Sequence, residues 1–139
     1  MSFGACANKT NSPLVTAAAH GRQLVIRNVK GKIISKVEVD GCVVTDNSPR
    51  CDYLFEIDAP MKKVIYLELK GKDVEKAYSQ LCATMDRFSV RHAGLIKDCH
   101  IVASRVPKSG PKTQVLKVRM LKDYGARLFV NTTRHQVDE

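Results

Sequence analysis

Long apolar runs are missing from this chain of 139 residues. None of its apolar stretches approaches the ~18–20 residues that a membrane-spanning helix needs. The first ten residues also lack the basic start and the apolar core of a secretory signal. We therefore expect a soluble, cytoplasmic protein without a membrane partner.

Paired cysteine motifs are missing as well. The sequence has 5 cysteines and no C-x-x-C pair or Cys/His cluster at zinc spacing, which argues against a structural zinc site. The five are Cys6, Cys42, Cys51, Cys82 and Cys99. We expect them to be reduced thiols that act as small core residues.

Internal repeats, low-complexity tracts and interdomain linkers are also absent, and the length suits one domain. Residues 1–12 are polar and lack periodicity, so we expect a flexible N-terminal arm. Residues 13–131 would form the domain, and residues 132–139 a polar tail.

Acidic residues are scarce, and none precedes Glu38. The chain has 23 Lys and Arg against 14 Asp and Glu, a formal net charge of +9. So basic a domain favours a polyanionic partner such as nucleic acid. The alternative is that the charge serves solubility alone.

The pattern of apolar and polar residues predicts a mixed sheet with helices packed on it. Alternation and flanking turn residues predict strands at 23–28, 33–39, 42–45, 51–58, 64–70, 95–104 and 127–131. Helices are expected at 13–20, at 73–88 and at 109–124, the last with an apolar stripe of Val115, Val118, Leu121 and Tyr124. The strands at 51–58 and 64–70 should be antiparallel neighbours, with Glu56 and Asp58 on a solvated face.

Charges interrupt the most apolar of these strands. In V-I-Y-L-E-L-K-G-K, residues 64–72, Glu68 and Lys70 lie on one face because side chains alternate along a strand. A buried charge must be paired or must bind a metal, so the pair needs an explanation. One explanation is an ordinary surface ion pair. The other is a functional site shared with Asp52, which lies at the start of the preceding strand.

Asp52, followed by Glu68-Leu69-Lys70 on the next strand and Gln80 on the following helix, resembles the D…(E/D)-x-K signature of the PD-(D/E)XK nuclease superfamily. The strings C-D-Y-L-F-E-I-D and V-I-Y-L-E-L-K-G-K-D-V-E-K-A-Y-S-Q-L look like its small stand-alone members, akin to Holliday-junction resolvases and RecB-type nuclease cores. The resemblance covers about 40 residues. It implies a single α/β domain of restriction-endonuclease-like fold, with a mixed central sheet and flanking helices.

The chemistry of this spacing fits a nuclease. Asp52 and Glu68, converging at a sheet end, can hold Mg²⁺ or Mn²⁺, and Lys70 would orient or help to deprotonate the attacking water. By the resemblance, the backbone carbonyl of Leu69 would be a further metal ligand, and Gln80 would position the nucleophile or a phosphate. The alternatives are a turn-capping role for Asp52 and an ordinary helix-face position for Gln80.

One part of the family pattern is missing. Members usually supply a Glu from the first helix, and this chain has no acidic residue there. His20 or Asp40 could stand in, although a lone His is more often structural and Asp40-Gly41 is explained by a hairpin turn. A catalytically silent relative that binds nucleic acid or a protein partner is therefore the alternative function.

Basic residues cluster late in the chain. Arg105 and Lys108 flank a helix start, where backbone donors and the helix dipole favour phosphate, and Lys112 and Arg119 continue along that helix. They would bind the nucleic-acid backbone, or they form an ordinary solvated face. We expect the substrate to be DNA rather than RNA. A homodimer would suit a cutter of duplexes, because two nicks on opposite strands need two sites.

Overall fold

The computed structural model describes residues 3–69, 73–104 and 111–139. The elements follow in chain order: η1 (Gly4–Cys6), β1 (Ala7–Thr10), β2 (Leu14–Ala19), β3 (Arg22–Arg27), β4 (Ile34–Glu38), β5 (Tyr53–Ile57), β6 (Lys63–Glu68), α1 (Val74–Arg87), β7 (Ile96–Ala103), α2 (Pro111–Tyr124), β8 (Ala126–Thr132) and β9 (Arg134–Asp138). The chain is a single α/β domain with two mixed sheets and two helices.

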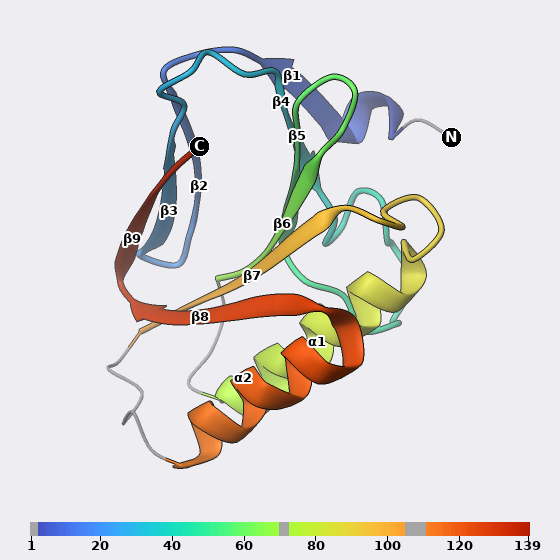
Figure 1. Ribbon diagram of the computed structural model, residues 1–139, viewed down its shortest axis with the longest axis vertical. Helices are drawn as coiled ribbons and strands as arrows, with labels where there is room; N and C mark the ends of the chain where they lie inside the picture. The colour runs from blue at the N-terminus through green and yellow to red at the C-terminus, as the bar shows by residue number, and fades with distance from the viewer. Residues whose placement is uncertain (1–2, 70–72, 105–110) are drawn as a thin grey trace.

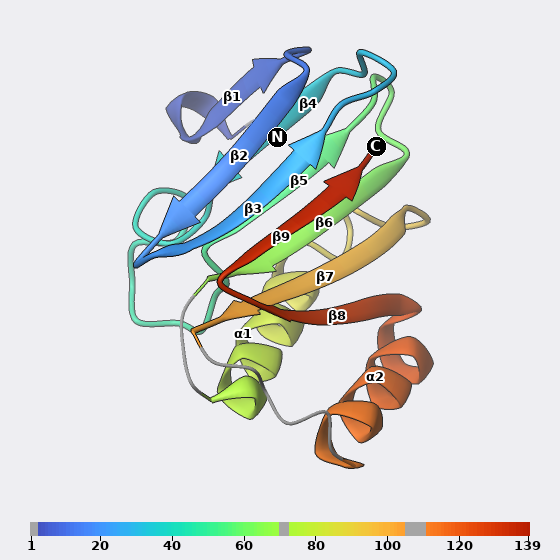
Figure 2. The same cartoon turned by 90° about the vertical axis from the view of Figure 1, so that its left-hand side faces the viewer.

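Three layers make up the domain. A six-stranded sheet in the order β1-β4-β5-β6-β7-β8 carries α1 and α2 on one face, and a three-stranded sheet, β2-β3-β9, covers its other face (Figure 1). Figure 2 looks onto the small sheet, with the helices behind and below. Central strands such as β6 are therefore buried on both faces.

The large sheet changes direction at β6. Strands β4, β5 and β6 form an antiparallel meander, whereas β7 and β8 run parallel to β6 after crossovers through α1 and α2. The predicted strands at 23–28, 33–39, 51–58, 64–70, 95–104 and 127–131 and the helices at 73–88 and 109–124 are confirmed, with small differences at their ends.

Alternation along β6 serves two cores. Val64 and Tyr66 belong to the core under the helices, and Ile65, Leu67 and Leu69 belong to the core between the sheets. Glu68 follows Tyr66 on the helix-side face and is buried. A surface ion pair on a half-solvated strand is therefore ruled out for Glu68.

The helix expected at 13–20 is wrong, because these residues form β2. Val15 and Ala17 are buried while Leu14 and Thr16 are exposed, which is the period of two of a strand. His20 and Gly21 both have positive φ, 52° and 75°, as a two-residue hairpin turn requires.

The two termini are also more ordered than expected. Residues 7–10, assigned to the flexible arm, form β1 on the edge of the large sheet, where β1 pairs with β4. Residues 134–138, assigned to the polar tail, form β9, which pairs with β3. Pairing to a neighbouring strand satisfies the backbone of these polar segments, which lack an apolar stripe of their own.

Cys6 and Cys42 form a disulfide bond, so the expectation that all five thiols are reduced is wrong. The bond ties η1 to the turn that follows β4. Disulfides are typical of oxidising compartments, and the cytoplasmic location remains a prediction without support from the structure. Within the described ranges, no helix has the length and the apolarity to cross a membrane.

Two local predictions also differ. Residues 42–45 form a turn with one isolated bridge, Asp40 to Val44, in place of a strand. On α2, Val115, Val118 and Leu121 are exposed, and Leu116 and Met120 face the core. Two apolar stripes lie side by side on this helix, and periodicity alone does not tell which one faces the sheet.

Candidate functional site

Asp52 and Glu68 lie next to each other at one end of β5 and β6. Tyr53 pairs with Leu67 at the end of the antiparallel ladder, and Asp52 and Glu68 are the next residues of the two segments. The Asp52 N–H donates to the Leu67 carbonyl oxygen at 3.1 Å, so the regular one-to-one register stops there. Asp52 and Glu68 are both buried, at 6% and 1% exposure. Neighbouring like charges repel, and a cation held between two carboxylates would remove that repulsion.

Backbone hydrogen bonds fix Asp52. Its Oδ2 atom accepts a hydrogen bond from the Leu69 N–H at 2.7 Å. Its carbonyl oxygen accepts from the N–H groups of Val39 at 3.0 Å and Asp40 at 3.3 Å. The Asp52 carboxylate thus lies against the Glu68-Leu69 segment, as we expected from the sequence.

Arg22 reaches this site from the small sheet. Its Nη1 atom donates a hydrogen bond to the Leu69 carbonyl oxygen at 3.0 Å. That oxygen was the expected third metal ligand, and here a guanidinium occupies it. No pattern in the sequence indicates this contact, and Arg22 is notable there only because it directly follows the His20-Gly21 turn.

A buried hydroxyl locks α1 to the same end of the sheet. The Cys51 N–H donates to Thr84 Oγ1 at 2.8 Å, and the Thr84 hydroxyl donates to the Gln80 carbonyl oxygen at 2.8 Å. Thr84 is fully buried. Gln80 is therefore held at a fixed position relative to Asp52, and Thr84, a polar residue on the apolar face of the helix, is the signal that could have revealed this link.

Replacing Thr84 with valine is expected to lower the free energy of unfolding by about 1–3 kcal/mol, because the buried Cys51 N–H loses its acceptor. Urea denaturation followed by circular dichroism measures the loss. Thr84→Ser keeps the hydroxyl and should lose less. If the valine variant were as stable as the wild type, this hydrogen bond would not be what holds α1 in place.

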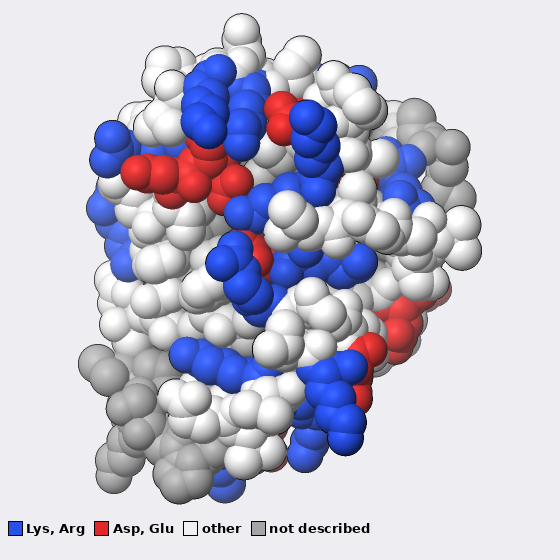
Figure 3. Space-filling view, in the orientation of Figure 1, with Lys and Arg blue, Asp and Glu red and all other residues white. Residues whose placement is uncertain are grey.

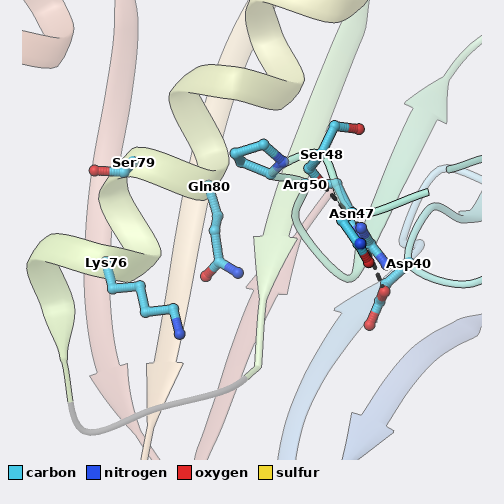
Figure 4. Close-up of a pocket in the computed structure, with 8 residues that line it drawn as sticks. Asp40, Asn47, Ser48, Arg50, Lys76, Ser79 and Gln80 are labelled. Carbon is cyan, nitrogen blue, oxygen red and sulfur yellow. Dashed lines mark hydrogen bonds and ion pairs between the residues drawn. The ribbon is translucent and has the colours of Figure 1, made fainter. Parts of the chain in front are cut away.

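Gln80 and Asp40 line one cleft of about 380 Å³ between α1 and the 47–50 loop (Figure 4). Asp40 forms an ion pair with Arg50, whose Nε lies 2.9 Å from Asp40 Oδ1. His20 is exposed in the β2–β3 turn. The structure thus places Asp40 beside the site, and gives His20 no contact with Asp52 or Glu68 within the described ranges.

Three of the predicted site residues, Lys70, Arg105 and Lys108, lie outside the described residues. Lys112 and Arg119 line a second cleft, of about 410 Å³, between α1 and α2. This cleft shares Ser79 with the first one. Figure 3 shows Lys and Arg in several groups over the face seen in Figure 1, with acidic side chains between them near the top left.

A separate ionic network lies toward the other end of β5. Glu56 in this network is buried, whereas we expected it on a solvated face. Glu56 Oε2 accepts from Arg91 Nε at 2.7 Å and lies 2.5 Å from His92 Nε2, and the Tyr66 hydroxyl lies 2.6 Å from His92 Nδ1. His92 and Tyr66 are fully buried, and both ring nitrogens of His92 and the Tyr66 hydroxyl are paired within the network. We interpret this network as structural.

Cys51, next to Asp52, is not a candidate nucleophile. Burial raises the pKa of its thiol to about 12. The thiolate is the reactive form, and at neutral pH it would be almost absent. Cys51 therefore serves as a packing residue beside the carboxylates.

The donor set suits a hard divalent cation with water as its remaining ligands. Asp52 and Glu68 supply carboxylate oxygens, whereas the Leu69 carbonyl is taken by Arg22. Mg²⁺ usually keeps several waters and binds through one or two carboxylates, so these two residues fit it. No group of three or more His, Cys, Asp or Glu at metal-binding distance occurs in the described part of the chain.

Comparisons with protein-family models, with curated proteins and with solved structures find no match to this chain.

Proposed function

We propose that this chain is a metal-dependent nuclease of the PD-(D/E)XK type, with a restriction-endonuclease-like fold, that hydrolyses phosphodiester bonds in nucleic acid, DNA rather than RNA. The observation that carries the proposal is the hydrogen bond from the Leu69 N–H to Asp52 Oδ2, with Glu68 buried beside it. It brings two carboxylates, separated by fifteen intervening residues in the chain, to one end of two paired strands.

The topology around the carboxylates supports this proposal. Asp52 directly precedes the middle strand of an antiparallel meander, Glu68 ends the third strand, and α1 with Gln80 follows before a parallel strand. This is the order that the sequence resemblance implies. The difference lies on the other face of the sheet, where β2 and β3 take the place of the expected first helix.

In the proposed reaction, water attacks phosphorus, the bond to the leaving oxygen breaks, and the leaving oxygen takes up a proton. Asp52 and Glu68 would hold Mg²⁺ or Mn²⁺. The bound ion would make a coordinated water more acidic and stabilise charge on the phosphate. Lys70 orients that water and balances the negative charge that develops, a role inferred from the sequence alone. Gln80 donates a hydrogen bond to the water or to a phosphate oxygen.

The test is a cleavage assay on single-stranded, duplex and branched DNA and on RNA, with Mg²⁺, with Mn²⁺ and with EDTA. The proposal predicts cleavage that EDTA stops and that Lys70→Ala lowers strongly. Lys62→Ala, an exposed lysine before the other end of β6, is the matched control and should cut as the wild type does. Activity unchanged by Lys70→Ala and by EDTA would contradict the catalytic assignment.

One observation favours a second function, a silent relative that binds nucleic acid without cutting it. Arg22 holds the Leu69 carbonyl and brings a positive charge to the site, which opposes cation binding. The chain also lacks the acidic residue that family members supply from their first helix, and this absence favours the silent relative as well. Salt-sensitive binding of DNA without cleavage in any metal would favour this function over the nuclease.

A further inference from the structure

The cleft beside the two carboxylates has the features of a binding site for a polar ligand. Asn47, Ser48 and Arg50 line it from the loop, and Lys76, Ser79 and Gln80 line it from α1. Its volume of about 380 Å³ lies within the ~300–1,000 Å³ range of small-molecule sites. In Figure 4 the side chains of Lys76 and Gln80 extend from α1 on the side of the cleft that faces Arg50 and Asn47.

The charge of the cleft favours an anion. Asp40 is balanced by Arg50, whose Nε lies 2.9 Å away. Arg50 is also held by the Ser48 carbonyl oxygen, at 2.8 Å from its Nη1. Lys76 is exposed, and within the described ranges no ion pair of its ammonium group is found. Its charge is therefore available to a phosphate group at this position.

The amides of the cleft suit the edge of a base. Asn47 and Gln80 each present a carbonyl acceptor and an NH₂ donor, and neither side-chain amide makes a hydrogen bond to the described residues. Asn and Gln amides pair with the donor and acceptor edges of bases. Pro49 adds apolar surface between them.

The position of the cleft ties it to the carboxylates. The Cys51–Thr84–Gln80 hydrogen bonds hold one wall in place relative to Asp52, and the Asp40 N–H, on the other wall, donates to the Asp52 carbonyl oxygen at 3.3 Å. A ligand in the cleft would thus lie close to Asp52, although neither Asp52 nor Glu68 lines the cleft itself.

We propose that this cleft binds one unpaired nucleotide next to the phosphate that is cut, so that the substrate is single-stranded or frayed at the cleavage point. The proposal rests on the proposed nuclease function. In a duplex the Watson–Crick edges are paired and the bases stacked, so a base enters a walled cleft only after it leaves the stack. The adjoining α1–α2 cleft, with Lys112 and Arg119, continues from Ser79 and would bind the backbone of the same strand.

The nucleotide site is tested by measuring oligonucleotide binding in EDTA, which prevents metal-dependent cleavage. Fluorescence anisotropy on the full chain compares a single-stranded oligonucleotide, its blunt duplex, and a duplex with a single-stranded overhang, as DNA and as RNA. We expect the single strand and the overhang to bind at least about tenfold tighter than the blunt duplex. Asn47→Ala combined with Lys76→Gln should lower the affinity for the single strand roughly tenfold.

The matched control is Asn11→Ala combined with Lys30→Gln, an exposed pair outside both clefts, which should bind as the wild type does. Titration with a deoxynucleoside monophosphate should shift the side-chain amide NMR signals of Asn47 and Gln80. Blunt duplex bound as tightly as single strand, with no effect of the Asn47/Lys76 variant, would overturn the proposal.

The two proposals fail differently. Cleft-dependent single-strand binding without cleavage in any metal supports the nucleotide site and overturns the nuclease. Metal-dependent cleavage whose strand preference is insensitive to Asn47 and Lys76 overturns the nucleotide site and leaves the nuclease.

Discussion

Replacing Glu68 with glutamine is expected to lower metal-dependent cleavage by at least about 10²–10³-fold. Glu68 is buried near Asp52, and the neutral amide keeps its shape while removing one of the two charges that attract the cation. The amide has almost the same size as the carboxylate, so we expect the variant to stay folded. Loss of activity without loss of stability separates a site residue from a structural one.

Single-turnover cleavage and urea denaturation measure the two effects on the same preparation. Glu38→Gln, an exposed carboxylate at the end of the neighbouring strand β4, is the matched control and should leave both unchanged. Should Glu68→Gln unfold the protein or cut at the wild-type rate, Glu68 would not be the metal ligand that we propose.

Replacing Glu56 with glutamine is expected to have the largest effect on stability, a loss of about 3 kcal/mol in the free energy of unfolding. Glu56 accepts hydrogen bonds from Arg91 and interacts with His92, which is fully buried and cannot turn to water. Thermal and urea denaturation measure the loss. The Lys112–Glu75 pair, at 87% and 63% exposure, is the contrast, and Glu75→Gln should cost less than about 0.5 kcal/mol.

The same carboxylate gives the stability a pH dependence. Burial alone would raise the pKa of Glu56, but the hydrogen bonds from Arg91 and His92 outweigh it and lower the pKa from 4.5 to about 2. The unfolded chain therefore binds more protons between these values, and the contribution of Glu56 is lost as the pH falls from 4.5 toward 2. In Glu56→Gln this part of the acid dependence should be absent, and an unchanged pH profile would contradict the pKa assignment.

Much of the fold followed from the sequence because its central elements have clean periodicity. Alternation with β-branched residues marked the β5–β6 pair. A regular apolar stripe marked α1, where the Asp73 side chain accepts a hydrogen bond from the Lys76 N–H. Short segments are harder to assign to a helix or a strand. Residues 13–20 suit two turns of helix as well as a strand, and pairing with β3 and burial between the sheets decide for the strand.

The site was predicted in part. Asp52 and Glu68 were placed together because strand pairing follows from two adjacent patterns, although the register itself had to come from the structure. Arg22 reaches Leu69 across 47 residues of sequence, and Cys6 reaches Cys42 across 36. Such contacts depend on how one sheet lies on another or how an edge strand is tied down, and local patterns do not encode either.

The most direct test of the central claim, that Asp52 and Glu68 together hold a divalent cation, is a titration of Mn²⁺ followed by the EPR signal of the free ion. We expect a bound ion in the wild type, and loss of that ion in Asp52→Asn and in Glu68→Gln. Glu38→Gln should bind as the wild type does. Binding that survives in both site variants, or a wild type that binds no Mn²⁺, would contradict the account and leave the silent nucleic-acid-binding relative in its place.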